Sequence, residues 1–291
     1  MWETVFTGVF RMSAATARAA SARQLRGEDV GVPVRKMEQE YGDGIPDFWF
    51  MNNAFLSMFF AGFSANLPEG EAQFIHSVRA FQDRITDPVL RAQVRAFIGQ
   101  EAHHSREHNA LNESLKRRGY RLDRIEALAA KLNQWMRDYQ SSEKQLAGTV
   151  AGEHITALMS DFFINKHPEY LREMAPVMEK IWAWHAIEET EHKAVAFDVY
   201  DQHVGDRNLL RRTMIEITIV FFSLNTAQAF ALMRKSGEWT NWRMWRDAGR
   251  FARKMVRDLG RDYLDFYKKD YHPWQHDNSA ALAWARRTYL D

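Results

Sequence analysis

The 291-residue sequence contains no cysteine. That absence excludes disulfides, zinc ribbons, iron–sulfur clusters and thiol nucleophiles, and it leaves histidine and carboxylates as the only strong metal ligands. An excess of charge is missing too, because 39 lysines and arginines nearly cancel 38 aspartates and glutamates. No overall field therefore favours nucleic acid or an acidic partner. The sequence also lacks a glycine-rich phosphate loop, a Gly-x-Ser-x-Gly elbow and a dinucleotide fingerprint.

Strand signals are few, and the apolar residues recur mostly at helical spacing, so we expect an all-α fold. Helix-start and helix-end signals divide the middle of the chain into four long helices at about 68–85, 88–119, 142–165 and 176–205. A shorter helix, at about 122–139, joins the second to the third. A hairpin, one long crossover and a second hairpin form the ferritin-like four-helix bundle. Residues 33–235 are the expected ferritin-like di-metal domain.

Both ends of the chain are expected to add helices. Residues 1–32 are predicted to form an amphipathic arm, rich in alanine and arginine, that precedes an aromatic-rich helix at 48–63. This arm has no continuous apolar stretch of the kind found in secretory signals, so we expect a cytoplasmic protein. Residues 236–291, with many Trp, Tyr and Arg residues, are expected to form a helical extension packed on the bundle.

Residues 209–233 are long and apolar enough to span a bilayer, but polar residues such as Arg211, Arg212 and Glu216 interrupt them. We expect a fifth helix buried against the bundle. A membrane- or lipid-contacting surface is the alternative, and it would make the protein peripheral to the membrane.

Histidine is concentrated in short stretches that also carry glutamate. One stretch contains Glu101-x-x-His104, and another contains His185-x-x-x-Glu189-x-x-His192. Residues three or four apart share one face of a helix, so such a glutamate and histidine can point at the same ions. Apolar residues at helical spacing place these faces toward the core.

Two further glutamates are expected at the same level of the bundle. The first hairpin turns fifteen residues from both Glu71 and Glu101, and the second turns eighteen residues from both Glu153 and Glu189. Four buried carboxylates would be costly without compensation, and two divalent ions supply four positive charges. The predicted metal ligands are therefore Glu71, Glu101, His104, Glu153, His185, Glu189 and His192.

Some assignments stay open at this point. Glu69 is an alternative to Glu71, although Glu71 fits the apolar stripe better. Glu188 is a candidate for a group that supports the ligands, or for an occasional ligand. His108 shares the inward face with His104, and it could support a ligand, serve as an eighth ligand or simply pack in the core.

Other polar groups are expected outside the centre. Glu107 and Glu191 are predicted to lie on solvated or interhelical faces. His272, His276 and Asp277 could bind another ion, but polar residues around a Pro-Trp turn are more typical of loop anchors.

The ligand order Glu…Glu-x-x-His…Glu…His-x-x-x-Glu-x-x-His resembles that of the di-iron N-oxygenases, which convert aryl amines such as p-aminobenzoate to nitro compounds. From about residue 33 to the end, the chain also resembles a bacterial family named only "predicted metal-dependent hydrolase". The resembling segments are Pro68-Glu-Gly-Glu71, Gln100-Glu-Ala-His-His, Glu153-His-Ile-Thr, Trp184-His-x-x-Glu-Glu-x-Glu-His-Lys and His272-Pro-Trp. The ligand pattern by itself does not imply that the reaction is a hydrolysis.

We therefore expect a non-haem di-iron oxygenase or oxidase that activates O2 to oxidise an apolar or aromatic small molecule. Its cofactors would be two iron ions, with manganese or a mixed pair as alternatives. Electrons would come from an external reductase or a ferredoxin-like carrier, because no cofactor motif is present. A two-metal hydrolase is the alternative, and a non-enzymatic metal-binding or lipid-associated protein is a further one. No nucleic-acid partner is expected, and a homodimer is left open.

Overall fold

A computed structural model describes residues 25–42 and 44–290. Apart from one isolated bridge between Phe50 and Met174, these residues form helices, turns and loops. The prediction of an all-α fold is confirmed. Most of the predicted N-terminal arm lies outside the described residues.

The helices follow one another with short connections. In chain order they are α2 (Ala54–Arg79), α3 (Pro88–Arg117), α4 (Asp123–Tyr139), α5 (Ser142–Asp161), α6 (Glu169–Arg172), α7 (Pro176–His192), α8 (Val195–His203), α9 (Arg207–Met233), α10 (Trp242–Asp265) and α11 (Ser279–Tyr289). Short 3-10 turns lie at Gly27–Val30, Gln82–Arg84, Glu238–Thr240 and Pro273–Gln275, and a π-turn at Phe162–Lys166 extends α5. Helices α3, α4, α5 and α9 lie close to their predicted positions.

Helix α2 is longer than predicted. We expected Pro68 to begin a helix, but it lies inside one continuous helix that includes the aromatic-rich segment. Proline has no N–H for the carbonyl four residues earlier, here that of Ser64. Asn112 Nδ2 on α3 donates to this carbonyl at 3.1 Å and replaces the missing bond. The helix therefore continues and brings Glu71 into the interior.

The predicted helix at 176–205 is broken into α7 and α8. Helix α7 ends at His192, and α8 begins at Val195. No proline or glycine marks the break. The side chain of Lys193 turns away here to donate to the carbonyl of His276 (2.7 Å) and to Asn278 Oδ1 (3.0 Å). Contacts with the C-terminal region thus accompany a break that local sequence does not signal.

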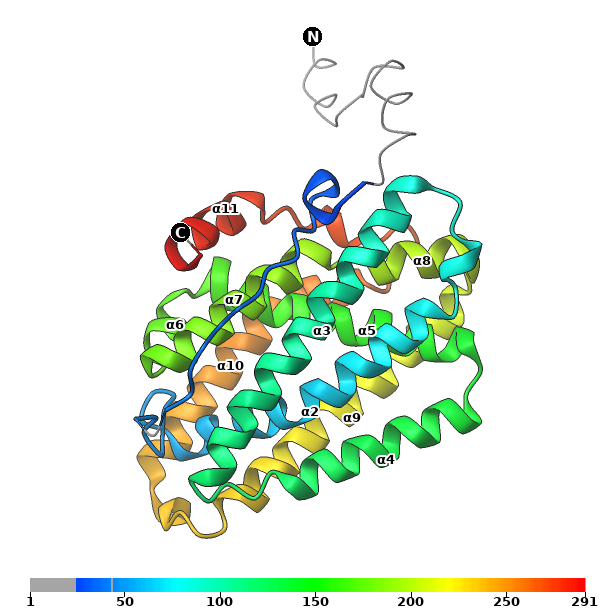
Figure 1. Cartoon of the computed structure of the whole chain (residues 1–291). Helices are drawn as coiled ribbons and strands as arrows, with labels where there is room; N and C mark the ends of the chain where they lie inside the picture. Colours follow the sequence, from blue (N-terminus) through cyan, green and yellow to red (C-terminus); the bar gives the residue numbers. More distant parts are fainter. Residues whose placement is uncertain (1–24, 43, 291) are drawn as a thin grey trace.

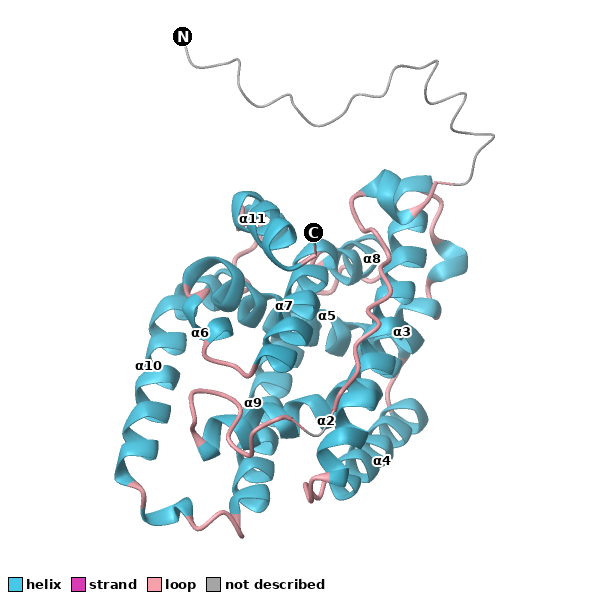
Figure 2. Cartoon of the chain, turned by 60° about the vertical axis from the view of Figure 1, so that its left-hand side comes forward, coloured by secondary structure: helices cyan, strands magenta, loops and turns pink. Residues whose placement is uncertain are grey.

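Helices α2, α3, α5 and α7 lie side by side and surround the centre of the molecule (Figure 1). Helix α4 packs along the outside of α2, and α9 packs against α2 and α5. On another side, α10 contacts α2 and α5, and α11 contacts α7 (Figure 2). An extended segment at residues 32–42 runs across α3 and α7 (Figure 1). The division of the chain into an arm, a bundle and a C-terminal extension stays a prediction.

Helix α9 forms as predicted, but the expectation that it is buried was wrong for much of its surface. It is the one helix among the described residues that is long and apolar enough to cross a membrane, and only 17% of its most apolar window is buried. By themselves, length and composition are weak evidence for a membrane span. Its polar residues Asn225 and Gln228 are buried, and Gln228 Oε1 accepts a hydrogen bond from Asn66 of α2 at 2.7 Å. Leu210 and Met214 are buried, but Ile215 and Ile219 are exposed, so part of the apolar surface of α9 faces outward.

Candidate metal centre

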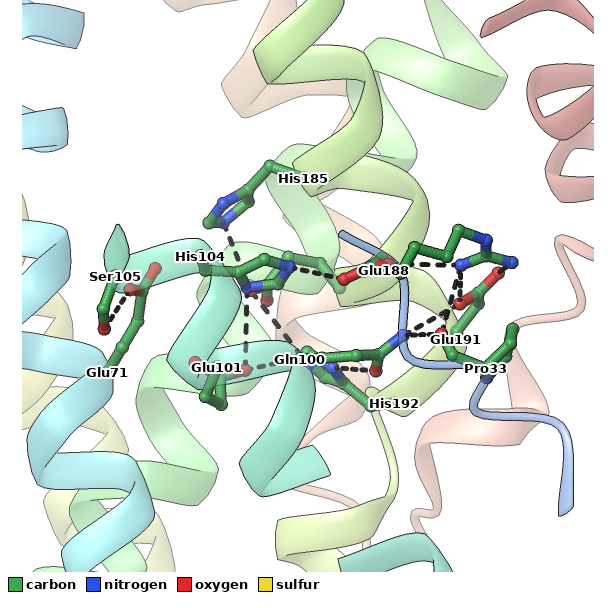
Figure 3. A network of polar contacts seen from close by, with 12 residues as sticks. Pro33, Glu71, Gln100, Glu101, His104, Ser105, His185, Glu188, Glu191 and His192 are labelled. Atoms are coloured by element: carbon green, nitrogen blue, oxygen red, sulfur yellow. Dashed lines mark hydrogen bonds and ion pairs between the residues drawn. The ribbon is translucent and has the colours of Figure 1, made fainter. Parts of the chain in front are cut away.

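All seven predicted ligands lie in the interior, on the four helices α2, α3, α5 and α7. Figure 3 shows Glu71, Glu101, His104, His185 and His192 among them. None of these residues is more than 4% exposed. The continuous α2 supplies Glu71, and α5 supplies one glutamate, Glu153. Helices α3 and α7 each supply a Glu-x-x-His pair, and His185 is added one turn earlier on α7.

The ligand atoms form two groups. In each of two sets, Glu71–His104–His185 and Glu101–Glu189–His192, one atom per residue lies within 4.8 Å of the others. Glu153 Oε2 lies 3.2 Å from His192 Nε2 and so borders the second group. Glu189 Oε1 lies 3.2 Å from His185 Nε2 and 3.7 Å from His192 Nε2. It is therefore positioned between the two groups, where one carboxylate can contact two ions.

The hydrogen bonding of these atoms fits metal ions. Within the part of the chain that the structure describes, six of the seven predicted ligands carry buried atoms without a hydrogen-bond partner: Glu71 Oε1, both oxygens of Glu101 and of Glu153, His104 Nδ1, His185 Nε2 and His192 Nε2. Such atoms are rare and costly in folded proteins. Two helices that each give a glutamate and two that each give Glu-x-x-His are the arrangement of ferritin-like di-iron and di-manganese proteins. The residues present therefore fit a pair of ions with nitrogen and oxygen ligands.

Neighbouring side chains select the nitrogen that each histidine offers. Each ring has its other nitrogen in a hydrogen bond: His104 Nε2 with Glu188 Oε2 (3.1 Å), His185 Nδ1 with His108 Nε2 (3.1 Å) and His192 Nδ1 with Gln100 Oε1 (2.9 Å). The opposite nitrogens are those without a partner. Outer partners of this kind fix the ring orientation and tautomer of metal-binding histidines.

The partner of His185 is itself held in place. If His185 Nδ1–H donates to His108 Nε2, His108 Nδ1–H donates to Ser64 Oγ at 2.9 Å, and the Ser64 hydroxyl donates to Asn112 Oδ1 at 2.7 Å. Both nitrogens of His108 are thus engaged, which places this residue behind a ligand. Glu69, the open alternative to Glu71, lies apart from the cluster and accepts a hydrogen bond from Asn133 at 3.0 Å.

Sequence reasoning missed several supporting residues. Ser105 Oγ donates to Glu71 Oε2 at 2.8 Å, and the Thr156 hydroxyl donates to Glu189 Oε2. Gln100 Nε2 donates to Glu191 Oε2 at 3.0 Å, and Arg35 pairs with the same carboxylate at 2.8 Å. Helical spacing could have found Ser105 and Thr156, which follow Glu101 by four residues and Glu153 by three. Arg35 lies in an extended segment and carries no such signal.

The polar groups expected outside the centre do lie outside it. Glu107 and Glu191 are buried between elements rather than solvated. His272 Nε2 lies 2.9 Å from Asp198, and Asp277 accepts a hydrogen bond from the Ser279 backbone at 3.0 Å, so both anchor loops.

A third group of potential ligands, Asp262, Asp265 and His276, lies partly exposed near the C-terminal loop. Lysine ammonium groups already pair with its carboxylates, Lys166 with Asp262 and Lys268 with Asp265. This neutralisation makes it a weaker candidate for an ion than the central cluster.

Burial and neighbouring charges both shift the pKa values of the centre. It raises the pKa of Glu71 and Glu101 well above the usual value, and nearby carboxylates add to the shift. Burial likewise raises the pKa of Glu153 to about 7. Against the effect of burial, Glu153 and Glu189 raise the pKa of His192 well above its usual value. Without ions the cluster therefore retains protons, and bound ions would displace them.

Glu188→Ala is expected to weaken metal binding by about 10- to 100-fold, because His104 loses the carboxylate that orients its ring. Competition with a chromophoric chelator for Mn²⁺ measures the affinity. Glu113→Ala, which changes an exposed glutamate on α3, is the control and should bind like the parent protein. Equal affinities in both variants would show that Glu188 has no part in holding His104.

The fold and the site define an all-α protein with a buried carboxylate–histidine centre for metal ions. The chain belongs to the family described as "predicted metal-dependent hydrolase", which matches residues 33–277. No curated protein and no solved structure matches the chain significantly. The resemblance to this family is thus confirmed, and a metal-dependent protein is supported. The resemblance to the aryl-amine N-oxygenases stays a prediction.

Proposed function

We propose that this protein is a di-iron enzyme that activates O2 and oxidises an apolar small molecule, with manganese as an alternative metal. One observation carries the proposal: seven buried ligands from four helices form two adjacent groups, with Glu189 between them. Bound iron would supply electrons for the reduction of O2. The donor set without thiolate is one that suits iron and manganese.

The protein's own residues hold and shield this centre. Glu188, His108 and Gln100 orient the three histidine rings. Aromatic rings border the ligands, with Phe97 centred 4.9 Å from the His192 ring and Trp184 centred 4.8 Å from the His104 ring. These apolar walls keep bulk water from the ligands and strengthen electrostatic interactions inside.

The reaction we propose needs an external electron donor, a reductase or a ferredoxin-like carrier. The sequence has no cysteine for an iron–sulfur cluster and no fingerprint for a nucleotide cofactor. Repeated turnover would therefore depend on a partner protein.

A two-metal hydrolase is the second candidate, and the description of the family favours it. The same ligands would hold two ions that activate a water molecule as the nucleophile. Hydrolysis needs neither O2 nor a reductant, so O2 consumption distinguishes the oxygenase from the hydrolase.

Protein loaded anaerobically with Fe²⁺ is expected to consume one O2 for each pair of iron ions oxidised, because two adjacent ferrous ions deliver two electrons together. An oxygen electrode measures the uptake, and Mössbauer spectroscopy measures the ferric product.

Glu101→Gln is expected to abolish the rapid uptake. Glu107→Gln, a change of a buried glutamate on the same helix, should leave it intact. The oxygenase proposal is overturned if the loaded protein consumes no O2. Anaerobic cleavage of p-nitrophenyl butyrate by the Zn²⁺- or Mn²⁺-loaded protein would then establish the hydrolase.

A further inference from the structure

An apolar cavity of about 240 Å³ lies between α2, α4, α5 and α9 and reaches the candidate metal centre. Glu71, a predicted ligand, lines it from α2, and Thr156 lines it from α5. The Thr156 hydroxyl donates to Glu189, the carboxylate between the two ligand groups. Most of the remaining wall is apolar and includes Phe63, Leu67, Phe74, Leu132, Ile217 and Phe221. The cavity therefore brings an apolar space directly to the ligands.

The shape of this cavity is elongated. Its lining extends over residues 63–74 of α2, 144–156 of α5 and 213–225 of α9. Twelve residues of helix correspond to about 18 Å at 1.5 Å per residue. An enclosed cavity of about 150 Å³ already accommodates benzene. A long and flexible aliphatic chain fits this space better than a compact polar molecule does.

The entrance to the cavity is largely apolar, although the ion pair between Lys144 and Glu216 also lines the cavity. Leu132 of α4 and Val220 of α9 line the cavity and are 38% and 51% exposed. Next to them, Trp135 of α4 and Ile219 of α9 are exposed too. In Figure 1, α4 and α9 run along the same side of the molecule. An apolar surface that surrounds an apolar opening is typical of a binding site for an apolar ligand.

The inner end of the cavity lies close to His185, which belongs to the same ligand group as Glu71. A small cavity of about 20 Å³ is lined by His185, and it shares Phe63 and Thr156 with the larger one. Phe63 and Thr156 thus lie between the apolar space and His185. A ligand that fills the larger cavity would have one end beside Glu71 and Thr156.

We propose that this cavity binds the substrate of the metal centre, and that the substrate carries an aliphatic chain such as that of a fatty acid or of a membrane lipid. The reaction that the substrate undergoes follows from the proposed function, on which this proposal rests. The aliphatic nature of the substrate follows from the cavity. The chain enters between α4 and α9, and its inner end lies next to the metal ligands.

Glycines in the wall make the proposal testable. A Cβ atom at Gly148 or at Gly70 would meet no atom within 4 Å, and both residues line the cavity. A larger side chain at either position can therefore occupy the cavity without displacing its neighbours. Gly152 differs, because a Cβ atom there would lie 2.5 Å from the ring of Phe74.

The probe is dansyl-labelled undecanoic acid, whose fluorescence increases in apolar surroundings, titrated into the metal-loaded protein. Gly148→Leu is expected to weaken probe binding at least about tenfold, which corresponds to about two methylene groups displaced from the cavity. Gly249→Leu is the matched control, because this exposed glycine of α10 also has open space around its Cβ position. It should bind the probe like the parent protein. Gly70→Leu, from the opposite wall, replaces Gly148→Leu if that variant does not fold.

Metal content and O2 uptake are measured on the same samples, so the two proposals fail separately. Probe binding that is absent, or that is equal in the parent protein and the cavity-filling variants, overturns the substrate cavity even if O2 is consumed. Probe binding that is lost only in the cavity-filling variants supports the cavity even if the protein consumes no O2. Vesicles of phosphatidylcholine and phosphatidylglycerol separate the two sources: vesicles that displace the probe indicate a lipid chain, and vesicles that do not displace it indicate a free fatty acid.

Discussion

Removal of the metal ions by a chelator is expected to lower the melting temperature by about 15 °C or more at pH 8. Without ions, the buried carboxylates of the centre lie close to one another with no metal cation to balance their charge. An ion present at about 1,000 times its dissociation constant stabilises the fold by about 4 kcal/mol, and two ions contribute about twice as much. For a domain of this size, each kcal/mol shifts the melting temperature by about 2–4 °C.

The effect of the chelator should also depend on pH. The pKa values of Glu71 and Glu101 are raised well above the usual value, and that of Glu153 is raised to about 7, by burial in each case. Between pH 6.5 and 8 the folded metal-free protein therefore holds more protons than the unfolded chain, so its stability falls as the pH rises. The raised pKa of His192 acts in the same direction above pH 6.5. Burial lowers the pKa of His104 and His108, which opposes this trend near and below pH 6.5, where the imidazoles of the unfolded chain take up protons.

Thermal unfolding followed by circular dichroism, with and without chelator at pH 6.5 and pH 8, measures both effects. The difference between loaded and chelated protein should be larger at pH 8, and added Fe²⁺ or Mn²⁺ should restore the higher melting temperature. Superimposable melting curves at both pH values would show that no ions hold these carboxylates together.

The close approach of the seven predicted ligands could be predicted from the sequence, because two kinds of information agreed. Helical periodicity placed Glu101 with His104, and Glu189 with His192, on inward faces. Equal distances from the two hairpin turns then placed Glu71 and Glu153 at the same level, and the structure brings all of these residues together in the interior. Local spacing therefore predicted which helix faces point inward, and the positions of the hairpin turns predicted which residues lie at the same level of the bundle.

Features that depend on contacts between distant segments could not be predicted from helical periodicity or from the positions of the turns. Pro68 was expected to begin a helix, and only the Asn112 side chain on α3 explains why α2 continues through it. The hydrogen bond between Gln100 and His192 joins α3 to α7, and Arg35 reaches Glu191 from an extended segment. Such contacts bring together residues far apart in the sequence, so they leave no periodic signal.

Helix α9 shows that the hydropathy of a helix does not by itself predict which of its sides faces the core. Its apolar length was correctly predicted to be helical, but the direction of its polar side could not be inferred from hydropathy. Asn225 is buried and Gln228 bonds to Asn66 of α2, whereas the apolar residues Ile215, Ile219 and Val220 are exposed. Exposed apolar residues depart from the usual pattern of a surface helix, in which apolar residues face the core, and they are consistent with an apolar ligand entering beside α9.

Replacement of Glu101 by glutamine is expected to reduce the metal content from two ions per chain to one or none. Glu101 Oε1 lies 3.2 Å from His192 Nε2 and 3.9 Å from His104 Nδ1, so its carboxylate borders both ligand groups. The amide keeps the size of the side chain but removes its negative charge and one acceptor oxygen. Glu107→Gln is the matched control on the same helix, because Glu107 is also buried but pairs with Arg106 at 2.8 Å.

Elemental analysis of the purified variants, with circular dichroism as a check of folding, compares the two changes. We expect the Glu107 variant to retain two iron or manganese ions per chain, because its carboxylate faces a guanidinium group rather than the centre. The Glu101 variant should lose at least one ion and bind the other less tightly, since a shared carboxylate neutralises charge at both positions. If both variants keep the same number of ions as the parent protein, Glu101 is not a ligand. A single zinc ion in the parent protein, retained by both variants, would replace the two-ion centre with a different site.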